Sequence, residues 1–257
     1  MAATVWTLVR AQLALLARTP LALLAVLALP FAMLLALMLF IGFSFPTLEF
    51  GAMPGVRVID RLLPEMAGTV AASAGILVLT LHLAEMRDTG LLGRLRRSPM
   101  RDGAYIVAQA VVTVVLVAAS TALFMAVTFA FYGPPRTWQP LSLVAALLAV
   151  TYCSVSAGLL LGGLRMPRAG ARIAAPLCFV LLFAGSGLGV PREGWEGVAP
   201  WFYQVTTVNP LAQLNDFVFG AYVGRLSETW PAAAALVATA LVVNLVTRRV
   251  FNWEGTK

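Results

Sequence analysis

Long apolar stretches separated by short loops dominate this chain, and the basic residues are distributed unevenly among those loops. Each of six stretches can cross a hydrocarbon core about 30 Å thick, since a helix rises about 1.5 Å per residue. They cover residues 20–45, 64–84, 104–132, 141–163, 173–190 and 231–247. The amino-terminal segment, the second and fourth loops and the tail hold 13 of the 18 basic side chains: Arg10, Arg18, Arg87, Arg94, Arg96, Arg97, Arg101, Arg165, Arg168, Arg172, Arg248, Arg249 and Lys257. Because basic residues are retained on the cytoplasmic side, the sequence predicts an all-α integral membrane protein with six spans and both termini in the cytoplasm.

The composition agrees with a membrane protein and excludes several other classes. Hydrophobic residues make up 60% and charged residues 11%, which is far from the balance of a soluble domain. The net charge of +7 lies in short loops beside the spans, where it favours topology and contact with anionic lipid, so no nucleic-acid partner is expected. Cys153 and Cys178 lie inside predicted spans without the spacing of metal ligands. The predominance of arginine over a single lysine suggests GC-rich coding, and hence the cell (inner) membrane of a bacterium.

Proline residues mark most of the predicted span boundaries. Thr19-Pro20, Leu63-Pro64, Gln139-Pro140 and Trp230-Pro231 each place proline at an expected first helical residue, where its missing N–H costs nothing. We therefore expect helices to begin at these prolines.

Two segments outside the spans are predicted to form interfacial helices. Segment 2–18 repeats polar or small residues at three- and four-residue steps opposite an apolar side, as in a helix lying on the cytoplasmic surface. Region 191–230 is aromatic-rich and only moderately apolar. A seventh full span there would carry Arg248 and Arg249 outside, so we expect short re-entrant or interfacial extracellular helices before the last span.

Small residues recur at helical spacing in the second and fourth predicted spans. Gly68 and Ala72 share one face, and Ser154, Gly158 and Gly162 share another. Such faces allow helix backbones to approach closely in lipid. Packing within the chain is the favoured interpretation, and a subunit interface is the alternative.

The chain offers little that resembles a catalytic set. His82 is the single histidine and lies beside Glu85 at a predicted span end, while Ser186 has no assigned partner. The predicted spans hold almost no ionisable residues, which argues against a proton relay. A P-loop needs Gly-Lys-Ser/Thr, and the single lysine is Lys257. An intramembrane enzyme that uses His82 and a serine stays open as an alternative, as does an anchor protein without cargo.

The loop 85–103 carries the most informative pattern of the chain. It reads EMRDTGLLGRLRRSPMRDG, with acids first, then a Gly-Leu-Leu step, a basic cluster and Ser98-Pro99. A short amphipathic helix would present Leu91, Leu92 and Leu95 on one side, and Ser98-Pro99 would end it. A simple topology anchor needs only arginines and does not explain this order.

This loop resembles that of the membrane subunits of type-2 ATP-binding-cassette (ABC) exporters. In that family a loop of the form E-x-G-T-L-x-R-L-R-x-T-P joins spans two and three and docks into the ATPase subunit. The matching residues here are Asp88, Gly90, Leu92, Arg94, Leu95, Arg96, Ser98 and Pro99. Leu91 stands where threonine is usual, and Asp88 replaces glutamate. The segment APWFYQVTTVNPLAQLNDFVFG is similar to the family's outward P-x-W…N-P-L segment, through Pro200, Trp201, Asn209, Pro210 and Leu211.

The resemblance implies a single type-2 ABC transmembrane domain over residues 1–257. It implies a dimer with a second membrane subunit, identical or homologous, and two cytosolic ATPase subunits that bind the ATP and Mg, so no cofactor is expected in this chain. Glu85, Arg87 and Asp88 are then expected to contact the ATPase, with Leu91, Leu92 and Leu95 filling its groove and Arg94 and Arg96 flanking them. The loop 164–172 is either a smaller second contact or a topology anchor.

The cargo is less constrained by the sequence. Thr69, Ser73 and apolar neighbours are the expected lining of the substrate path, which favours a hydrophobic or amphipathic compound. By analogy with the family we expect efflux of a drug, antibiotic, natural product or lipid, with antibiotic resistance as a consequence. A polysaccharide or glycolipid exporter is the alternative, although more aromatic and polar lining would then be expected.

Overall fold

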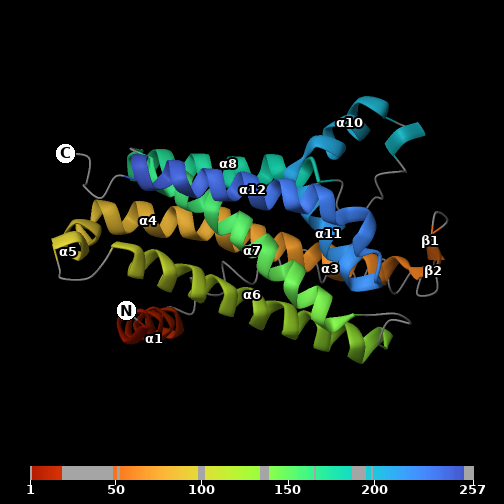
Figure 1. Ribbon diagram of the computed structural model, residues 1–257, viewed down its shortest axis with the longest axis horizontal. Coiled ribbons are helices and arrows are strands. Elements are labelled where there is room, and N and C mark those ends of the chain that lie inside the picture. The colour runs from red at the N-terminus through yellow and green to blue at the C-terminus, as the bar shows by residue number, and fades with distance from the viewer. Residues whose placement is uncertain are drawn as a thin grey trace.

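The structure is a computed structural model that describes residues 2–18, 49–50, 53–97, 102–133, 139–164, 166–186, 195–197 and 199–251. Helices pack lengthwise into an elongated bundle (Figure 1). Helix α5 lies at one end of the bundle, and the β1–β2 hairpin and α10 lie at the other (Figure 1). The first predicted span, 20–45, lies outside the described residues.

The second predicted span is the central rod of the bundle, and it is longer than expected. It consists of α3 (Val58–Ala72), the π-helical turn η1 (Ser73–Val78) and α4 (Leu79–Asp88) in direct succession. The expected start at Pro64 is wrong, because Pro64 lies inside α3. Hydropathy marks where a helix becomes apolar, whereas α3 begins earlier with charged residues that find partners within the protein. A short hairpin of β1 (Glu49–Phe50) and β2 (Met53–Arg57) precedes it.

The next helices follow the prediction closely at most of their ends. Helix α6 covers Asp102–Tyr132, and α7 covers Pro140–Gly163 with Pro140 in its first turn, as predicted. Helix α8 (Arg168–Ala184) begins earlier than residue 173 and has 17 residues. Helix α12 (Leu226–Val250) contains Pro231, so the expected start at that proline is also wrong.

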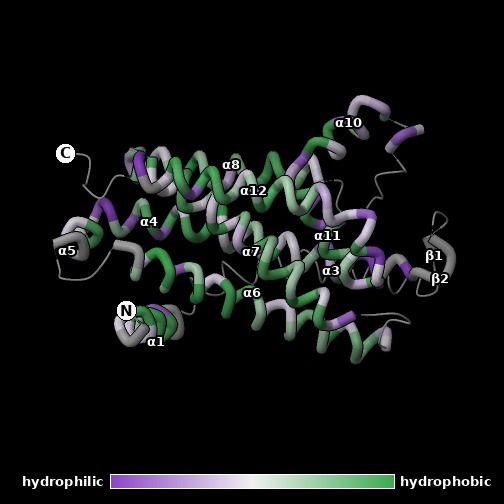
Figure 2. Tube along the Cα trace, in the orientation of Figure 1, coloured by the Kyte–Doolittle hydropathy of each residue, from purple (hydrophilic) through white to green (hydrophobic). Residues whose placement is uncertain are grey.

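Four of the described helical segments are long and apolar enough to cross a membrane. They are Asp60–Asp88, Ala104–Tyr132, Pro140–Gly163 and Leu226–Thr247. Apolar residues follow α6, α8 and α12 along much of their length (Figure 2). The described part of the chain is therefore a multi-helix bundle of the kind that a bilayer accommodates.

The aromatic-rich region before α12 folds into short helices, as predicted. Helices α10 (Pro200–Val208) and α11 (Pro210–Val223) are separated by Asn209, whose side chain caps α11 by accepting hydrogen bonds from the N–H groups of Leu211 and Ala212. Gly224, with φ of 82°, ends α11 in the left-handed conformation that glycine adopts without strain. The re-entrant placement of these helices in a membrane stays a prediction.

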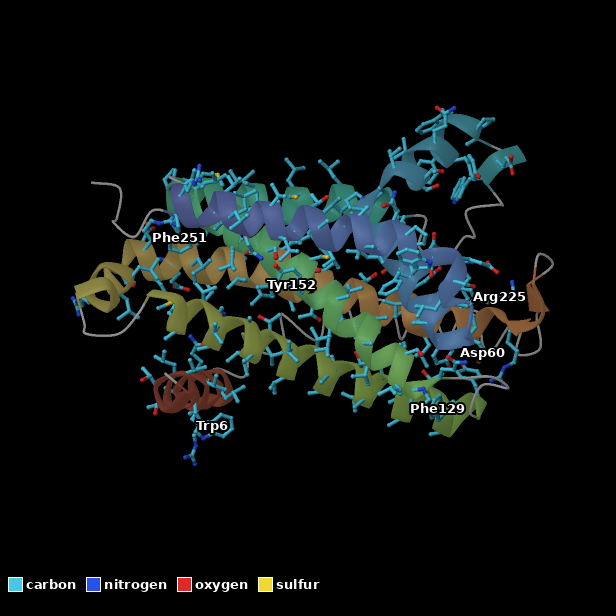
Figure 3. The ribbon with its side chains drawn as sticks, in the orientation of Figure 1. Trp6, Asp60, Phe129, Tyr152, Arg225 and Phe251 are labelled. Carbon is cyan, nitrogen blue, oxygen red and sulfur yellow. The ribbon has the colours of Figure 1, made fainter. Side chains whose placement is uncertain are left out.

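Helix α1 (Ala2–Arg18) has the amphipathic character that the sequence indicates. Val9 is buried against Ala108 and Val112 of α6. Trp6 is exposed and points away from the bundle (Figure 3). Its position on a membrane surface stays a prediction.

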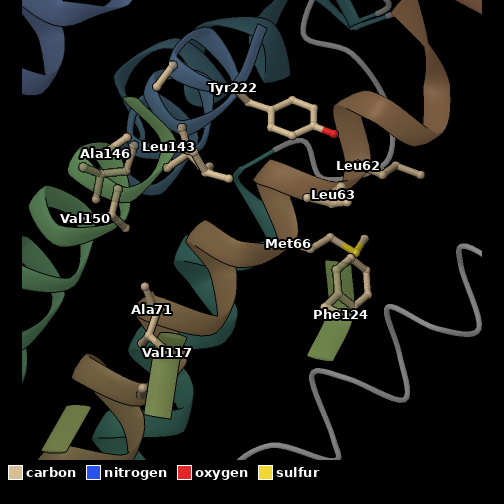
Figure 4. Close-up of a cluster of buried hydrophobic side chains, with 14 residues drawn as sticks. Leu62, Leu63, Met66, Ala71, Val117, Phe124, Leu143, Ala146, Val150 and Tyr222 are labelled. Atoms are coloured by element: carbon tan, nitrogen blue, oxygen red, sulfur yellow. The ribbon is translucent and has the colours of Figure 1, made fainter. Parts of the chain in front are cut away.

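The largest core cluster lies where α3, α6, α7 and α11 meet. Figure 4 shows its labelled members: Leu62, Leu63, Met66 and Ala71 of α3, Val117 and Phe124 of α6, Leu143, Ala146 and Val150 of α7, and Tyr222 of α11. The small residues of the rod and of α7 lie against each other, since a Cβ on Gly75 would overlap Ser154 and one on Gly158 would overlap the carbonyl oxygen of Gly75. For this face, packing within the chain is confirmed.

Candidate functional site

The end of the rod turns sharply into the short helix α5 (Leu91–Arg97). Thr89 and Gly90 make the turn, with the Gly90 N–H donating to the Arg87 carbonyl oxygen at 2.9 Å. Gly90 has φ of 71°, a conformation that favours glycine. The turn places α5 at the extreme end of the bundle (Figure 1).

The side chains of this turn divide into exposed and buried sets. Glu85, Asp88 and Arg94 are exposed, and Leu91 is 42% exposed to solvent. Leu92 is fully buried against Leu83, Met86 and Tyr105, so it fixes α5 to the rod and is not available to fill a partner's groove. The side chains of Leu95 and Arg96, and all of Ser98 and Pro99, lie outside the described residues.

Arg87 also differs from the expectation of an exposed partner contact. Its side chain is 2% exposed, and its guanidinium donates hydrogen bonds to the carbonyl oxygens of Gly162 and Leu164 at the end of α7. The structure therefore assigns Arg87 to a contact within the chain.

Glu85 connects the same turn to the next loop. Its carboxylate accepts a hydrogen bond from the Arg168 guanidinium at 2.6 Å, and the side chains of Arg168 and Glu85 are 38% and 55% exposed. An exposed pair of this kind contributes about 0–1 kcal/mol, so it aligns the start of α8 with the rod without fixing it firmly.

The aromatic segment at the opposite end of the bundle is built around its prolines and Asn209. Pro200 and Pro210 occupy the first turns of α10 and α11. Besides capping α11, Asn209 donates through Nδ2 to the Leu182 carbonyl oxygen of α8 at 2.9 Å. Trp201 is 69% exposed. The motif residues thus shape the short helices and join them to α8.

The comparison with protein families decides the identity of this arrangement. The model of the family described as ABC-2 type transporter matches residues 3–222. The chain belongs to this family. A comparison with curated proteins gives no match.

Membership makes the chain a multi-pass transmembrane permease of an ABC transporter, the partner of ABC ATPase subunits in a bilayer. ABC-2 permease domains are generally transport subunits without a nucleotide site of their own. Among the described residues, no group of three or more His, Cys, Asp or Glu side chains could hold a metal ion.

The residues expected along the substrate path of this ABC-2 permease are not open in the structure. Thr69 and Ser73 are each 1% exposed. Thr69 Oγ1 donates to the Glu65 carbonyl oxygen, and Ser73 Oγ donates to that of Val70. Both hydroxyls therefore donate to carbonyl oxygens within the rod. Asn215 of α11 also donates through Nδ2 to Thr69 Oγ1 at 3.5 Å.

The ABC-2 permease also contains a buried charged network that the sequence interpretation missed. Arg61 pairs with Glu65 at 2.8 Å and with Asp216 of α11 at 3.4 Å, and its guanidinium lies 5.0 Å from the Phe219 ring centroid. Taking the helix to start at residue 64 left Arg61 outside it. The spacing of Arg61 and Glu65, four residues apart, was the signal that could have revealed the pair.

A second ion pair lies beside this network at the start of α3. Arg57 pairs with Asp60 at 2.9 Å and donates to the Tyr132 carbonyl oxygen of α6 at 2.8 Å. The hydrogen bond to Asp60 raises the pKa of the Arg57 guanidinium above its usual value. Figure 3 shows Asp60 at this end of the bundle.

The structure separates His82 from Ser186, so these two residues do not form the catalytic pair of an intramembrane enzyme. His82 lies one turn before Glu85, which contacts Arg168 at the start of α8. Ser186 follows the other end of α8, and a helix of 17 residues is about 25 Å long. The two side chains therefore lie toward opposite ends of the bundle, too far apart for proton transfer.

Proposed function

We propose that this permease subunit exports a hydrophobic or amphipathic compound from the cell, powered by separate ATPase subunits that dock on the loop 85–103. The compound belongs to the drug, antibiotic, natural-product or lipid class. The working complex contains two membrane subunits and two ATPase subunits in the inner membrane of a bacterium. Each membrane subunit has six spans, with both termini in the cytoplasm.

The observation that carries the proposal is the position of α5. Helix α5 lies at the tip of the rod and is fixed to it by the buried Leu92; Leu91 and Arg94 of α5 are exposed, as is Asp88 at the end of α4. An acid, an apolar side chain and a base exposed around one short, well-supported turn suit a specific protein contact. Closure of the ATPase pair on ATP would push α5 and, through the continuous rod, tilt the bundle.

The surface of the helices supports the class of cargo. Side chains exposed along α6, α8 and α12 are mostly apolar, including Leu123, Leu177 and Leu245. A compound that reaches the permease from within the bilayer would meet such side chains, which favour an apolar or amphipathic molecule over a hydroxyl-rich polymer.

The docking step is tested with the double variant Asp88→Ala/Arg94→Ala, co-expressed with a cassette ATPase that the wild-type chain recovers in a pull-down. We expect normal membrane insertion and an affinity for the ATPase that falls about tenfold, equivalent to about 1.4 kcal/mol. The matched control is Glu196→Ala/Arg249→Ala, which removes one exposed acid and one exposed base elsewhere. A double docking variant that binds the ATPase as the wild type does would refute the docking site.

Cargo is tested with the intact complex in vesicles supplied with ATP. The probes are ethidium, doxorubicin and a fluorescent short-chain phospholipid, which cover apolar cations, aromatic amines and lipids. We expect ATP-dependent movement of at least one probe. A complex that hydrolyses ATP and moves none of them would contradict the proposed cargo class.

A further inference from the structure

The most unusual side chain at the cytosolic end of the rod is Arg87. It is among the largest side chains with almost no exposed surface, although the adjacent Asp88 is exposed and the turn into α5 begins there. Nη1 donates to the Leu164 carbonyl oxygen at 2.8 Å, and Nη2 donates to that of Gly162. A guanidinium is therefore buried between the tip of the rod and the end of α7.

The chemistry of the helix end explains why this burial is tolerated. The last carbonyl groups of a helix lack partners within the helix and carry partial negative charge, which suits a cation. A guanidinium can donate to two of them at once with a planar, rigid fork, whereas an ammonium group has no such geometry. The contact therefore specifies a fixed position of α7 relative to the rod.

Close packing on both sides makes this contact rigid. A Cβ on Gly162 would lie 2.8 Å from Leu83 Cδ1 of α4, and one on Gly163 would lie 2.8 Å from the ring of Phe251, after α12. Figure 3 shows Phe251 at this end of the bundle. The end of α7 is thus held between the rod and the end of α12, and α8 starts four residues after Leu164.

We propose that Arg87 is the positioning residue that carries movement of the α4–α5 turn to α7 and α8. The proposal rests on docking of the ATPase at α5. A push on α5 reaches Arg87, which directly precedes Asp88 at the end of α4, and the two hydrogen bonds to Gly162 and Leu164 pass the movement to α7. The exposed Glu85–Arg168 pair is too weak to do this alone.

The test compares nucleotide-driven changes in amide hydrogen exchange in the purified complex with its ATPase. Exchange is measured without nucleotide and with ATP and vanadate, in wild type, Arg87→Met, Arg87→Lys and the exposed control Arg249→Met. In the wild type and the control, trapping should change exchange by at least about fivefold in α5 and in residues 159–164 and 168–175. In Arg87→Met the change should persist in α5 and disappear in the other two segments. Arg87→Lys, which keeps one charged donor group, should restore part of it.

Each other outcome contradicts either the role of Arg87 or the docking of the ATPase at α5. A purely structural Arg87 would loosen residues 159–164 equally with and without nucleotide, leaving the difference between states intact, and that result overturns the proposal. The proposal is also overturned if, in the wild type, trapping with ATP and vanadate changes hydrogen exchange in α5 alone. If trapping leaves α5 of the wild type unchanged, the docking site itself fails. Should Arg87→Met not reach the membrane, Arg87→Gln replaces it in the same comparison.

Discussion

Gly158 of α7 lies where two helix backbones meet with no room for a side chain. A Cβ at this position would overlap the carbonyl oxygen of Gly75 in η1, and Leu79 lies beside it. Thr80 Oγ1 donates to the Gly158 carbonyl oxygen at 3.2 Å, so the same residue also joins the two helices through its backbone. The overlap is with backbone, which cannot rotate away as a flexible side chain could.

We predict that Gly158→Ala lowers the stability of the folded protein in detergent by about 1–3 kcal/mol, because the added methyl group forces the rod and α7 apart. The measurement is the Tm of the purified chain. Gly197→Ala serves as the matched control, since nothing lies within 4 Å of a Cβ built there. Equal Tm values for the two variants would show that the rod and α7 accommodate the added methyl group without loss of stability, which contradicts the prediction.

Arg87 and Leu92 show that single residues of the docking loop differ in whether they face solvent or the protein interior. Both belong to a loop whose composition indicates a partner contact, yet both side chains are buried within the subunit. Asp88, Leu91 and Arg94, interspersed with them, face solvent. A docking surface around so short a helix and its turn needs buried residues that hold it to the bundle, so only part of the motif is free for the partner.

At the scale of whole helices, a polar contact joins α7 and α12 within their apolar stretches. Asn244 Nδ2 donates to Tyr152 Oη and to Ser156 Oγ, each at 2.8 Å. Figure 3 shows Tyr152 near the middle of the bundle. In a membrane, such hydrogen bonds between helices add to van der Waals packing, because the hydrophobic effect contributes little there.

We expect Asn244→Leu to weaken the packing of α12 on α7 by about 0.6 kcal/mol, the average for such contacts between membrane helices, and by no more than about 1.7 kcal/mol, the maximum. Unfolding in mixed micelles measures it. Thr239→Val is the control on the same helix, because the exposed Thr239 hydroxyl donates to the Ala235 carbonyl oxygen of α12 itself. An unfolding midpoint unchanged by Asn244→Leu would mean that the two hydrogen bonds add nothing to the helix contact.

Across the molecule, the rod is tied to its neighbours at both ends by arginines. Arg87 holds α7 at the α5 end. At the other end Arg61 reaches Asp216 of α11, and Arg57 reaches Tyr132 at the end of α6. Gln139, before α7, donates its N–H to the Tyr222 carbonyl oxygen of α11 at 3.1 Å, which adds a contact between α7 and α11 at this end. A rod held in this way is suited to move with its neighbours as one body.

The charged network of Arg61, Glu65 and Asp216 leads to a prediction about paired substitutions. Glu65→Leu should cost about 3–5 kcal/mol of unfolding free energy, because it leaves the buried Arg61 guanidinium short of its closest carboxylate. Adding Arg61→Met should recover most of that loss, since a well-packed apolar pair often replaces a buried ion pair without penalty. Denaturation of the single and double variants supplies the comparison, and a double variant less stable than Glu65→Leu would contradict it.

The sequence by itself determined the apolar helices, the short helices before α12 and the position of the loop that joins α4 to α6. These depend on local patterns: the length of apolar runs, prolines and glycines at turns, and the spacing of charges. The same reasoning misplaced the starts of α3 and α12, because hydropathy reports the apolar part of a helix and not its hydrogen-bonded end.

Only the tertiary structure decided which residues of the loop face outward and how the charges at the other end are paired. Arg87 is buried because Gly162 and Leu164, 75 and 77 residues away in the chain, bring their carbonyl oxygens to it. Arg61 is buried because α11, 155 residues later, supplies Asp216. Such partners are far apart in sequence and become neighbours through packing of whole helices, which no local pattern encodes.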